Sequence, residues 1–200
     1  MSRTSKRTSG AVVRELLSVA DLLEEPRLAH LYSYLVREGE STVQELMDAL
    51  DLAQGTAYTD VNQLVDAGVI EVKRTDQPRT YVACEIDLTL SAVDGDREYT
   101  ITPALVDAVA RRTTDEDIDT YIDRHGISGL AIALSYALAR ERGEVTHRQM
   151  AADLDVSPLA AEIVIQALRP VVHEHFDVEA TGASVADIVG TADQHVDDET

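Results

Sequence analysis

Residues 39–70 read GESTVQELMDALDLAQGTAYTDVNQLVDAGVI, and this stretch decides the fold. The apolar residues of its first half recur at helical spacing and predict a short helix with an inner face of Val43, Leu46 and Leu50. Those of its second half predict another helix, whose inner face is Ala57, Val61 and Leu64. Leu52 lies in the short turn between them. This layout predicts a helix-turn-helix unit, in which the second helix is placed to enter a DNA major groove.

The residues around these helices predict where each one starts and stops. Ser41 fits the N-cap of the first helix, and Gln44 three residues later completes a capping box. Gly68 fits the left-handed position that ends the second helix. Two β-like runs follow, one with Val72 and one with Val82 and Ile86, and the turn Asp76-Gln77-Pro78 separates them. The sequence therefore predicts a two-stranded wing whose tip carries Lys73, Arg74 and Arg79.

Residues 26–86 resemble the winged helix-turn-helix domain of prokaryotic transcriptional regulators of the ArsR, MarR and TrmB kind. The resemblance is carried by Leu50-Asp51-Leu52, Thr56-Ala57 and the run from Leu64 to Ile70. It covers about a third of the chain and implies a DNA-binding regulator. The cysteine pair that marks ArsR metal sensors on the first helix is absent, because residues 43–50 contain no Cys.

The second helix offers mainly neutral hydrogen-bonding groups, which suit base edges and phosphates. The residues that we expect to contact DNA on this helix are Gln54, Gly55, Thr56, Tyr58, Thr59, Asn62 and Gln63. Lys73, Arg74 and Arg79 are expected to contact the flanking backbone. Asp60 is also predicted to face outward, where it would oppose phosphates, and the helix contains no Lys or Arg.

The composition is strongly acidic. The chain of 200 residues has a formal net charge of -20, and Lys6 and Lys73 are its only lysines. An acidic, lysine-poor surface stays hydrated in molar salt, so we interpret the chain as a haloarchaeal cytoplasmic protein; an ordinary acidic protein is the alternative. Cys84 has no partner for an internal disulfide, which also favours the cytoplasm.

A second stretch repeats the first at an offset of 104 residues. The identical pairs include Gly39 with Gly143, Thr42 with Thr146, Asp51 with Asp155, Ala57 with Ala161 and Leu64 with Leu168. Residues 127–170 are therefore predicted to form a second, degenerate helix-turn-helix unit. Thr146 and Ser157-Pro158 would open its two helices. A helical hairpin with chance matches is the alternative.

The second unit differs from the first in its predicted outer surface. Where the first unit has polar groups, the second has Leu159, Ile163 and Val164. An exposed apolar strip usually marks an interface, so these three residues are predicted to form a dimer interface. The alternative is that the strip packs internally against helices at 103–125.

Four segments are expected along the chain. They are a flexible basic arm at 1–10, the winged domain at 11–101, a helical dimerisation or effector domain at 102–180 and an acidic tail at 181–200. A helix is predicted at 11–23, and residues 98–101 would add a third strand to the wing. Further helices are predicted at 103–112 and 115–124, with a break at Gly126 before a core helix at 127–139.

No motif for catalysis stands out, since the chain has neither a Gly-rich phosphate loop nor a nucleophile elbow. His173 and His175 supply only two imidazoles, which is too few for a metal site by themselves. We interpret their spacing as that of alternate residues on a β-strand. We therefore expect no enzyme activity, no cofactor and no metal. No run approaches the about 18 apolar residues that a membrane span requires.

The sequence as a whole predicts a mainly α protein with small β wings. Its predicted function is that of a homodimeric, sequence-specific transcriptional regulator bound to double-stranded DNA, with an unknown small-molecule effector. The alternative is a tandem winged-helix adaptor that binds other proteins, as in chromosome organisation. Two-fold symmetry of the regulator would imply a palindromic operator.

Overall fold

The structure is a computed structural model that describes residues 19–91 and 98–178. Residues 19–24 are helical, and Val19, Leu22 and Leu23 of this segment are buried. The described part of the predicted helix at 11–23 is therefore confirmed, and its first half lies outside the described residues. So do the basic arm at 1–10 and the acidic tail at 181–200.

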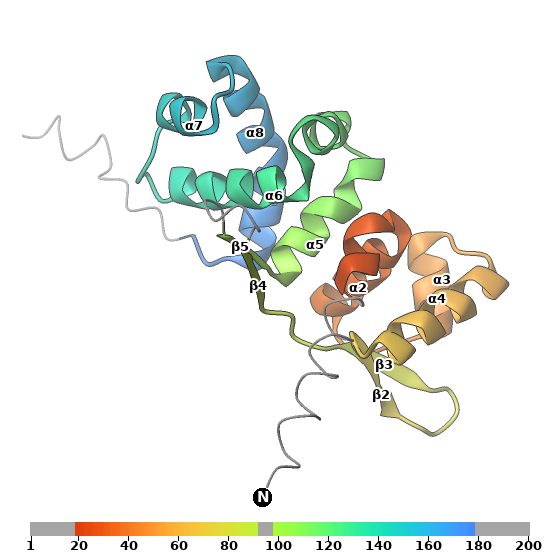
Figure 1. Cartoon of the computed structure of the whole chain (residues 1–200). Helices are drawn as coiled ribbons and strands as arrows, with labels where there is room; N and C mark the ends of the chain where they lie inside the picture. Colours follow the sequence, from red (N-terminus) through yellow and green to blue (C-terminus); the bar gives the residue numbers. More distant parts are fainter. Residues whose placement is uncertain (1–18, 92–97, 179–200) are drawn as a thin grey trace, which may run out of the picture.

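The first unit is a winged helix-turn-helix (Figure 1). It contains helices α2 (Pro26–Glu38), α3 (Val43–Leu50) and α4 (Gln54–Ala67), with strands β1 (Ser41–Thr42), β2 (Ile70–Arg74) and β3 (Thr80–Ala83). All three predicted inner-face residues of α4 are buried, because their spacing turns them toward α2 and α3. Gly68 ends α4 in the left-handed conformation at φ 77°, and its N–H donates to the carbonyl oxygens of Leu64 and Val65. The fold predicted for this stretch is confirmed.

The cap of α3 lies one residue later than predicted. Thr42 accepts a hydrogen bond from the N–H of Glu45 at 3.2 Å, and the Glu45 carboxylate accepts from the Thr42 N–H at 2.7 Å. Ser41 instead pairs with Tyr81 in the sheet of order β1-β3-β2. The capping box from Ser41 to Gln44 was therefore wrong, because long-range strand pairing holds Ser41 outside the helix.

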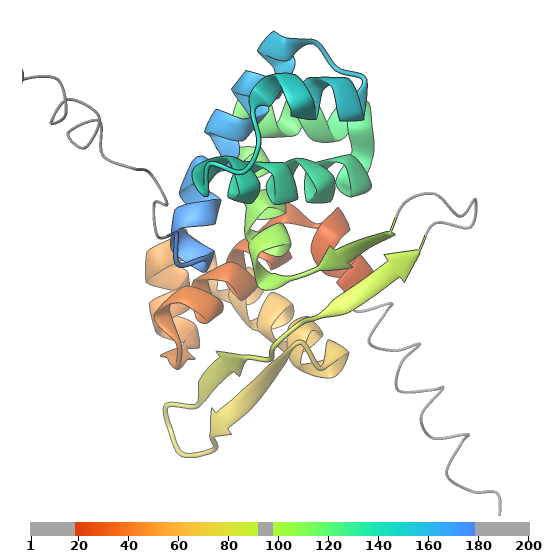
Figure 2. The same ribbon diagram turned by 90° about the vertical axis from the view of Figure 1, so that its left-hand side faces the viewer.

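The third strand of the wing also differs from the prediction. Strand β5 (Glu98–Ile101) pairs with β4 (Leu88–Ser91) in a separate two-stranded sheet, and β1 is the third strand beside β3. Figure 2 shows the β4–β5 hairpin continuing away from the wing toward the second unit. The hairpin is thus part of the connection between the two units.

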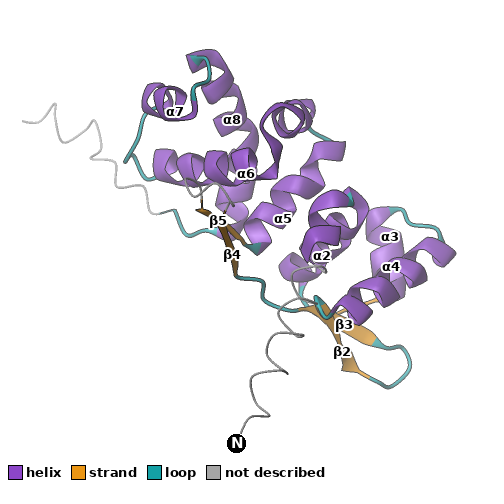
Figure 3. Cartoon of the chain, in the orientation of Figure 1, coloured by secondary structure: helices purple, strands orange, loops and turns teal. Residues whose placement is uncertain are grey.

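The second unit consists of helices, as Figure 3 shows. They are α5 (Pro103–Ala110), the 3-10 turn η1 (Arg111–Thr113), α6 (Glu116–Glu141), α7 (His147–Leu154) and α8 (Pro158–His175). Gly126 interrupts α6 with φ 67° and ψ -177°, so the predicted break is confirmed. Helix α5 packs against α2 of the first unit and against α6 and α8 of the second. The buried apolar residues of both units belong to one hydrophobic core.

The internal repeat is visible in backbone geometry as well as in sequence. Thr146 and Gln149 form a capping box like that of Thr42 and Glu45. Asp51 and Asp155 both end their helices in the left-handed region, at φ 51° and φ 54°. The second unit departs from the first after this point, since α8 continues to His175 and no strand follows it within the described residues. It is therefore a helix-turn-helix without a described wing.

Candidate nucleic-acid interface

The outer face of α4 is polar and largely free of charge. Six of the predicted contact residues are exposed there and Thr56 is half-buried; the six are Gln54, Gly55, Tyr58, Thr59, Asn62 and Gln63. The Thr59 hydroxyl donates to the Gly55 carbonyl oxygen at 2.8 Å, which leaves its own oxygen able to accept. Tyr58 exposes 48% of its surface, the most apolar feature of the face. This face can donate hydrogen bonds to base edges and phosphates, and it can accept hydrogen bonds from base edges.

Asp60 does not face outward, so that prediction was wrong. Its relative exposure is 1%, and its carboxylate accepts from Arg27 Nε at 2.7 Å and Nη2 at 3.1 Å. Arg27 lies in the first turn of α2, so the pair joins α4 to α2. The other acid of α4, Asp66, lies in its last turn. Because Asp60 is buried, the centre of the outer face of α4 has no exposed carboxylate that would repel DNA phosphates.

The wing carries the predicted cations, and all three are exposed. Lys73 and Arg74 belong to β2, and Arg79 precedes β3. Arg74 is not unpaired, because its Nε lies 2.9 Å from the Glu40 carboxylate. The same Glu40 oxygen accepts a hydrogen bond from the Thr80 hydroxyl at 2.6 Å. Within the described residues, Lys73 and Arg79 therefore have no ion-pair partner, whereas Arg74 is paired with Glu40.

The apolar strip of the second unit is shorter than predicted. Leu159 and Ile163 are exposed at 66% and 39%, and they lie four residues apart on α8. Val164 has a relative exposure of 1%, so its predicted place in an exposed interface was wrong. Val164 belongs to the core because it shares the inner face of α8 with Ala161, Ile165 and Leu168.

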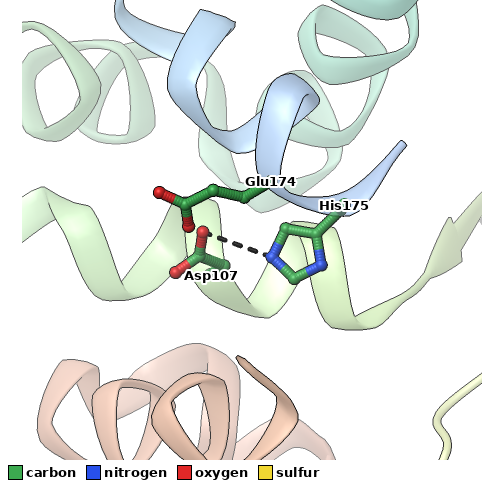
Figure 4. A group of neighbouring side chains, drawn as sticks. All are labelled: Asp107, Glu174 and His175. Carbon is green, nitrogen blue, oxygen red and sulfur yellow. Dashed lines mark ion pairs between the residues drawn. The ribbon is translucent and has the colours of Figure 1, made fainter. Parts of the chain in front are cut away.

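A partly buried ionic cluster, which was not predicted from the sequence, joins α5 and the turn η1 to α8; Figure 4 shows three of its residues. Arg111 Nη2 lies 2.9 Å from an Asp107 oxygen and 2.7 Å from a Glu174 oxygen, and His175 Nε2 lies 3.3 Å from Asp107. Burial alone would raise the pKa of Asp107, but the hydrogen bond from His175 and the charge of Arg111 outweigh it and hold that pKa below its ordinary value. Arg37 of α2 lies 3.5 Å from Glu174 and extends the cluster to the first unit.

This cluster brings together three groups of the kind that ligate metals. One ligand atom from each of Asp107, Glu174 and His175 falls within 4.8 Å of the others. Arg111 already bridges the two carboxylates, so a side-chain cation occupies the place that a metal ion would need. His173 and His175 lie in the last turn of α8, so their interpretation as strand residues was wrong. His173 Nε2 is 2.8 Å from Glu141 on α6.

Comparison with known families finds one match within each unit of the chain. Residues 29–87 match the family model described as sugar-specific transcriptional regulator TrmB. Residues 112–177 match DUF7437, described as a family of unknown function. No curated protein and no solved structure matches the chain. Among the described residues, none of the helices has the length and apolar character needed to cross a membrane. The first unit is therefore a TrmB-like winged helix-turn-helix domain, of the kind that DNA-binding transcriptional regulators carry.

Proposed function

We propose that the protein is a non-enzymatic, sequence-specific transcriptional regulator that binds double-stranded DNA as a homodimer in the cytoplasm. The observation that carries this proposal is the outer face of α4, where neutral hydrogen-bonding side chains are exposed while Asp60 is turned into the core against Arg27. A helix of this kind can approach a groove without a carboxylate at its centre. The TrmB match over the same residues supports the proposal.

Each part of the interface has a distinct role in the proposed complex. Gln54, Thr56, Tyr58, Thr59, Asn62 and Gln63 contact base edges or nearby phosphates, and Gly55 lets the backbone approach closely. Lys73, Arg74 and Arg79 contact the phosphate backbone, which positions the domain without reading sequence. Cations are scarce in this chain, which has 17 Lys and Arg against 37 acids. Their presence on an exposed wing therefore favours a DNA-binding protein over the alternative of a protein-binding adaptor.

The acidic composition fits this proposal if the protein works in concentrated salt, as a haloarchaeal protein does. Cationic contacts gain affinity by releasing ions, and that gain falls as the salt concentration rises. Neutral hydrogen bonds to bases do not depend on ion release. A recognition helix with no Lys or Arg is therefore suited to molar salt, and the cations of the wing supply the electrostatic attraction to the phosphates.

Replacing Asn62 by alanine is expected to weaken operator binding far more than binding to scrambled DNA. Asn62 is exposed on α4, and a lost base contact costs about 1–3 kcal/mol of discrimination. The operator is selected from a random duplex library, and both affinities are measured by fluorescence anisotropy in concentrated potassium chloride. Gln166→Ala on α8 is the matched control, because it also removes an exposed amide from a helix. Equal losses on operator and scrambled DNA would show that Asn62 does not read sequence.

Replacing Arg74 and Arg79 by glutamate is expected to weaken binding to every sequence by at least about tenfold, because like charges would face the phosphates. The matched control is Arg124→Glu with Arg148→Glu, which changes the net charge equally at two exposed arginines of the second unit. Gel-shift titrations with operator and scrambled duplexes measure the effect. If the wing variant and the control bind alike, the wing does not contact DNA.

A further inference from the structure

A cavity of about 700 Å³ lies between the β4–β5 hairpin, helices α5 and α6, and the segment that follows α8. Its volume falls within the range of small-molecule sites in proteins. Strands β4 and β5, which contribute to its lining, lie between the two units in Figure 1. The residues that line it are Thr89, Tyr99, Thr100, Thr102, Leu105, Ala131, Ile132, Leu134, Ser135, Leu138 and Phe176.

None of the lining residues is charged, although the chain has 37 acids and 17 Lys and Arg. Leu105, Leu134 and Leu138 are among the apolar lining residues, and Phe176 adds an aromatic ring from the segment after α8. Moving an ion into such surroundings without a counter-charge is costly. The lining therefore offers no counter-charge to an anionic or cationic ligand.

Hydroxyl groups supply the polar part of the wall, and they keep unused hydrogen-bonding capacity. Thr102 accepts from the Leu105 N–H at 3.3 Å, so its own hydrogen can donate elsewhere. Ser135 donates to the Ala131 carbonyl oxygen at 3.1 Å, so its oxygen can accept. The Tyr99 hydroxyl forms no hydrogen bond with another described residue. The cavity thus combines an apolar wall with a few neutral donors and acceptors.

We propose that this cavity binds an uncharged small molecule with an apolar body and one or two hydroxyl or carbonyl groups. A sugar fits less well, because its many hydroxyl groups would lie unpaired against the leucine side chains. Helix α5 lines the cavity and also packs against α2 of the DNA-binding unit. An occupant therefore touches an element that supports the first unit. Control of DNA binding by the occupant rests on the proposed function, whereas binding itself does not.

The test uses 2-naphthol, which has an apolar body and one hydroxyl group, and the full chain without DNA. Isothermal titration is expected to give a dissociation constant in the micromolar range. Naphthalene-2-sulfonate has the same body with a charge, and it is expected to bind at least about tenfold more weakly. Maltose is expected not to bind.

Two tryptophan variants locate the site, and the natural chain contains no Trp. Ser135→Trp fills the cavity from an exposed position of α6, and it is expected to weaken 2-naphthol binding at least about tenfold. Arg124→Trp adds the same side chain at an exposed position of α6 that does not line the cavity, and its affinity should equal that of the natural chain. Circular dichroism confirms that both variants are folded.

Three results would overturn the inference. They are equal binding of 2-naphthol and its sulfonate, binding that Ser135→Trp leaves unchanged, and binding detected only after deletion of residues 179–200. The last result would show that the chain's own C-terminal segment fills the cavity. Operator affinity is then measured with and without 2-naphthol. Failure of DNA binding alone would contradict the proposed function and leave the titration intact.

Discussion

Replacing Arg27 by alanine is expected to lower the free energy of unfolding by about 3 kcal/mol, because it leaves the Asp60 carboxylate buried without its cation. Asp60 has a relative exposure of 1%, and both of its oxygens accept from the Arg27 guanidinium. Arg27 itself is 52% exposed, so the lost attraction is partly screened by water and the effect should stay below the largest values for buried pairs. Urea denaturation at constant potassium chloride measures the change.

The second unit supplies the control for this prediction. The repeat aligns Arg27 with Ala131 and Asp60 with Val164, and both residues of the second unit are buried. The double variant Arg27→Ala with Asp60→Val copies this apolar pair, and it should recover most of the lost stability. Arg124→Ala should change little, because Arg124 is exposed and forms no ion pair within the described residues. A loss below about 0.5 kcal/mol for Arg27→Ala would contradict the assigned role of the pair.

Introducing an aspartate at Leu159 or at Ile163 is expected to convert the proposed dimer into a folded monomer. Both side chains are exposed on one face of α8, and a buried carboxylate there would oppose a symmetric apolar contact. Operator affinity should fall by about 100-fold or more, because a monomer loses the second, intramolecular binding event. Light scattering measures the mass, and anisotropy measures the affinity.

The two positions separate an interface from a core. Leu159 is 66% exposed, so its replacement tests the interface with little effect on packing, whereas Ile163 at 39% also touches its own unit. Ala152→Asp is the control, since it places the same charge at an exposed position of α7. A dimer that survives Leu159→Asp would exclude this strip as the interface. Loss of cooperative unfolding in Ile163→Asp alone would place Ile163 in the core.

The helices of both units could be predicted because their apolar spacing is local information. Local spacing did not decide whether residues at the edge of a helix's buried face are buried or exposed. Asp60 and Val164 are equivalent in the repeat, and both were predicted to face outward although both are buried. Position 60 lies three residues after Ala57 and one before Val61, so helical spacing alone places it inside. The charged side chain of Asp60 favoured an exposed position in the prediction, because the sequence does not show that Arg27 neutralises it.

Other features depend on contacts between distant residues. Ser41-Thr42 and Gln44-Glu45 satisfy the capping-box pattern in two registers, and only the pairing of Ser41 with Tyr81 selects the later one. The ionic cluster is similar, since Asp107 on α5 and Arg111 in the adjoining turn η1 lie four residues apart, but Glu174 and His175 come from α8. The spacing of Asp107 and Arg111 was the only local signal for it. The polar face of α4 was confirmed as exposed except at Thr56 and Asp60, because exposure follows from the same helical period.

In the proposed complex, the Glu40 carboxylate would compete with DNA phosphate for Arg74. Because Arg74 is already held at 2.9 Å, binding exchanges one anionic partner for another, while Lys73 and Arg79 gain a partner outright. The released Glu40 keeps its hydrogen bond from Thr80 and attracts a solvent cation in place of the arginine. Association therefore frees fewer ions than three wing cations would free alone, and the logarithm of affinity should fall less steeply with the logarithm of salt concentration. A regulator built in this way would lose less affinity with rising ionic strength than one whose three wing cations were all unpaired before binding.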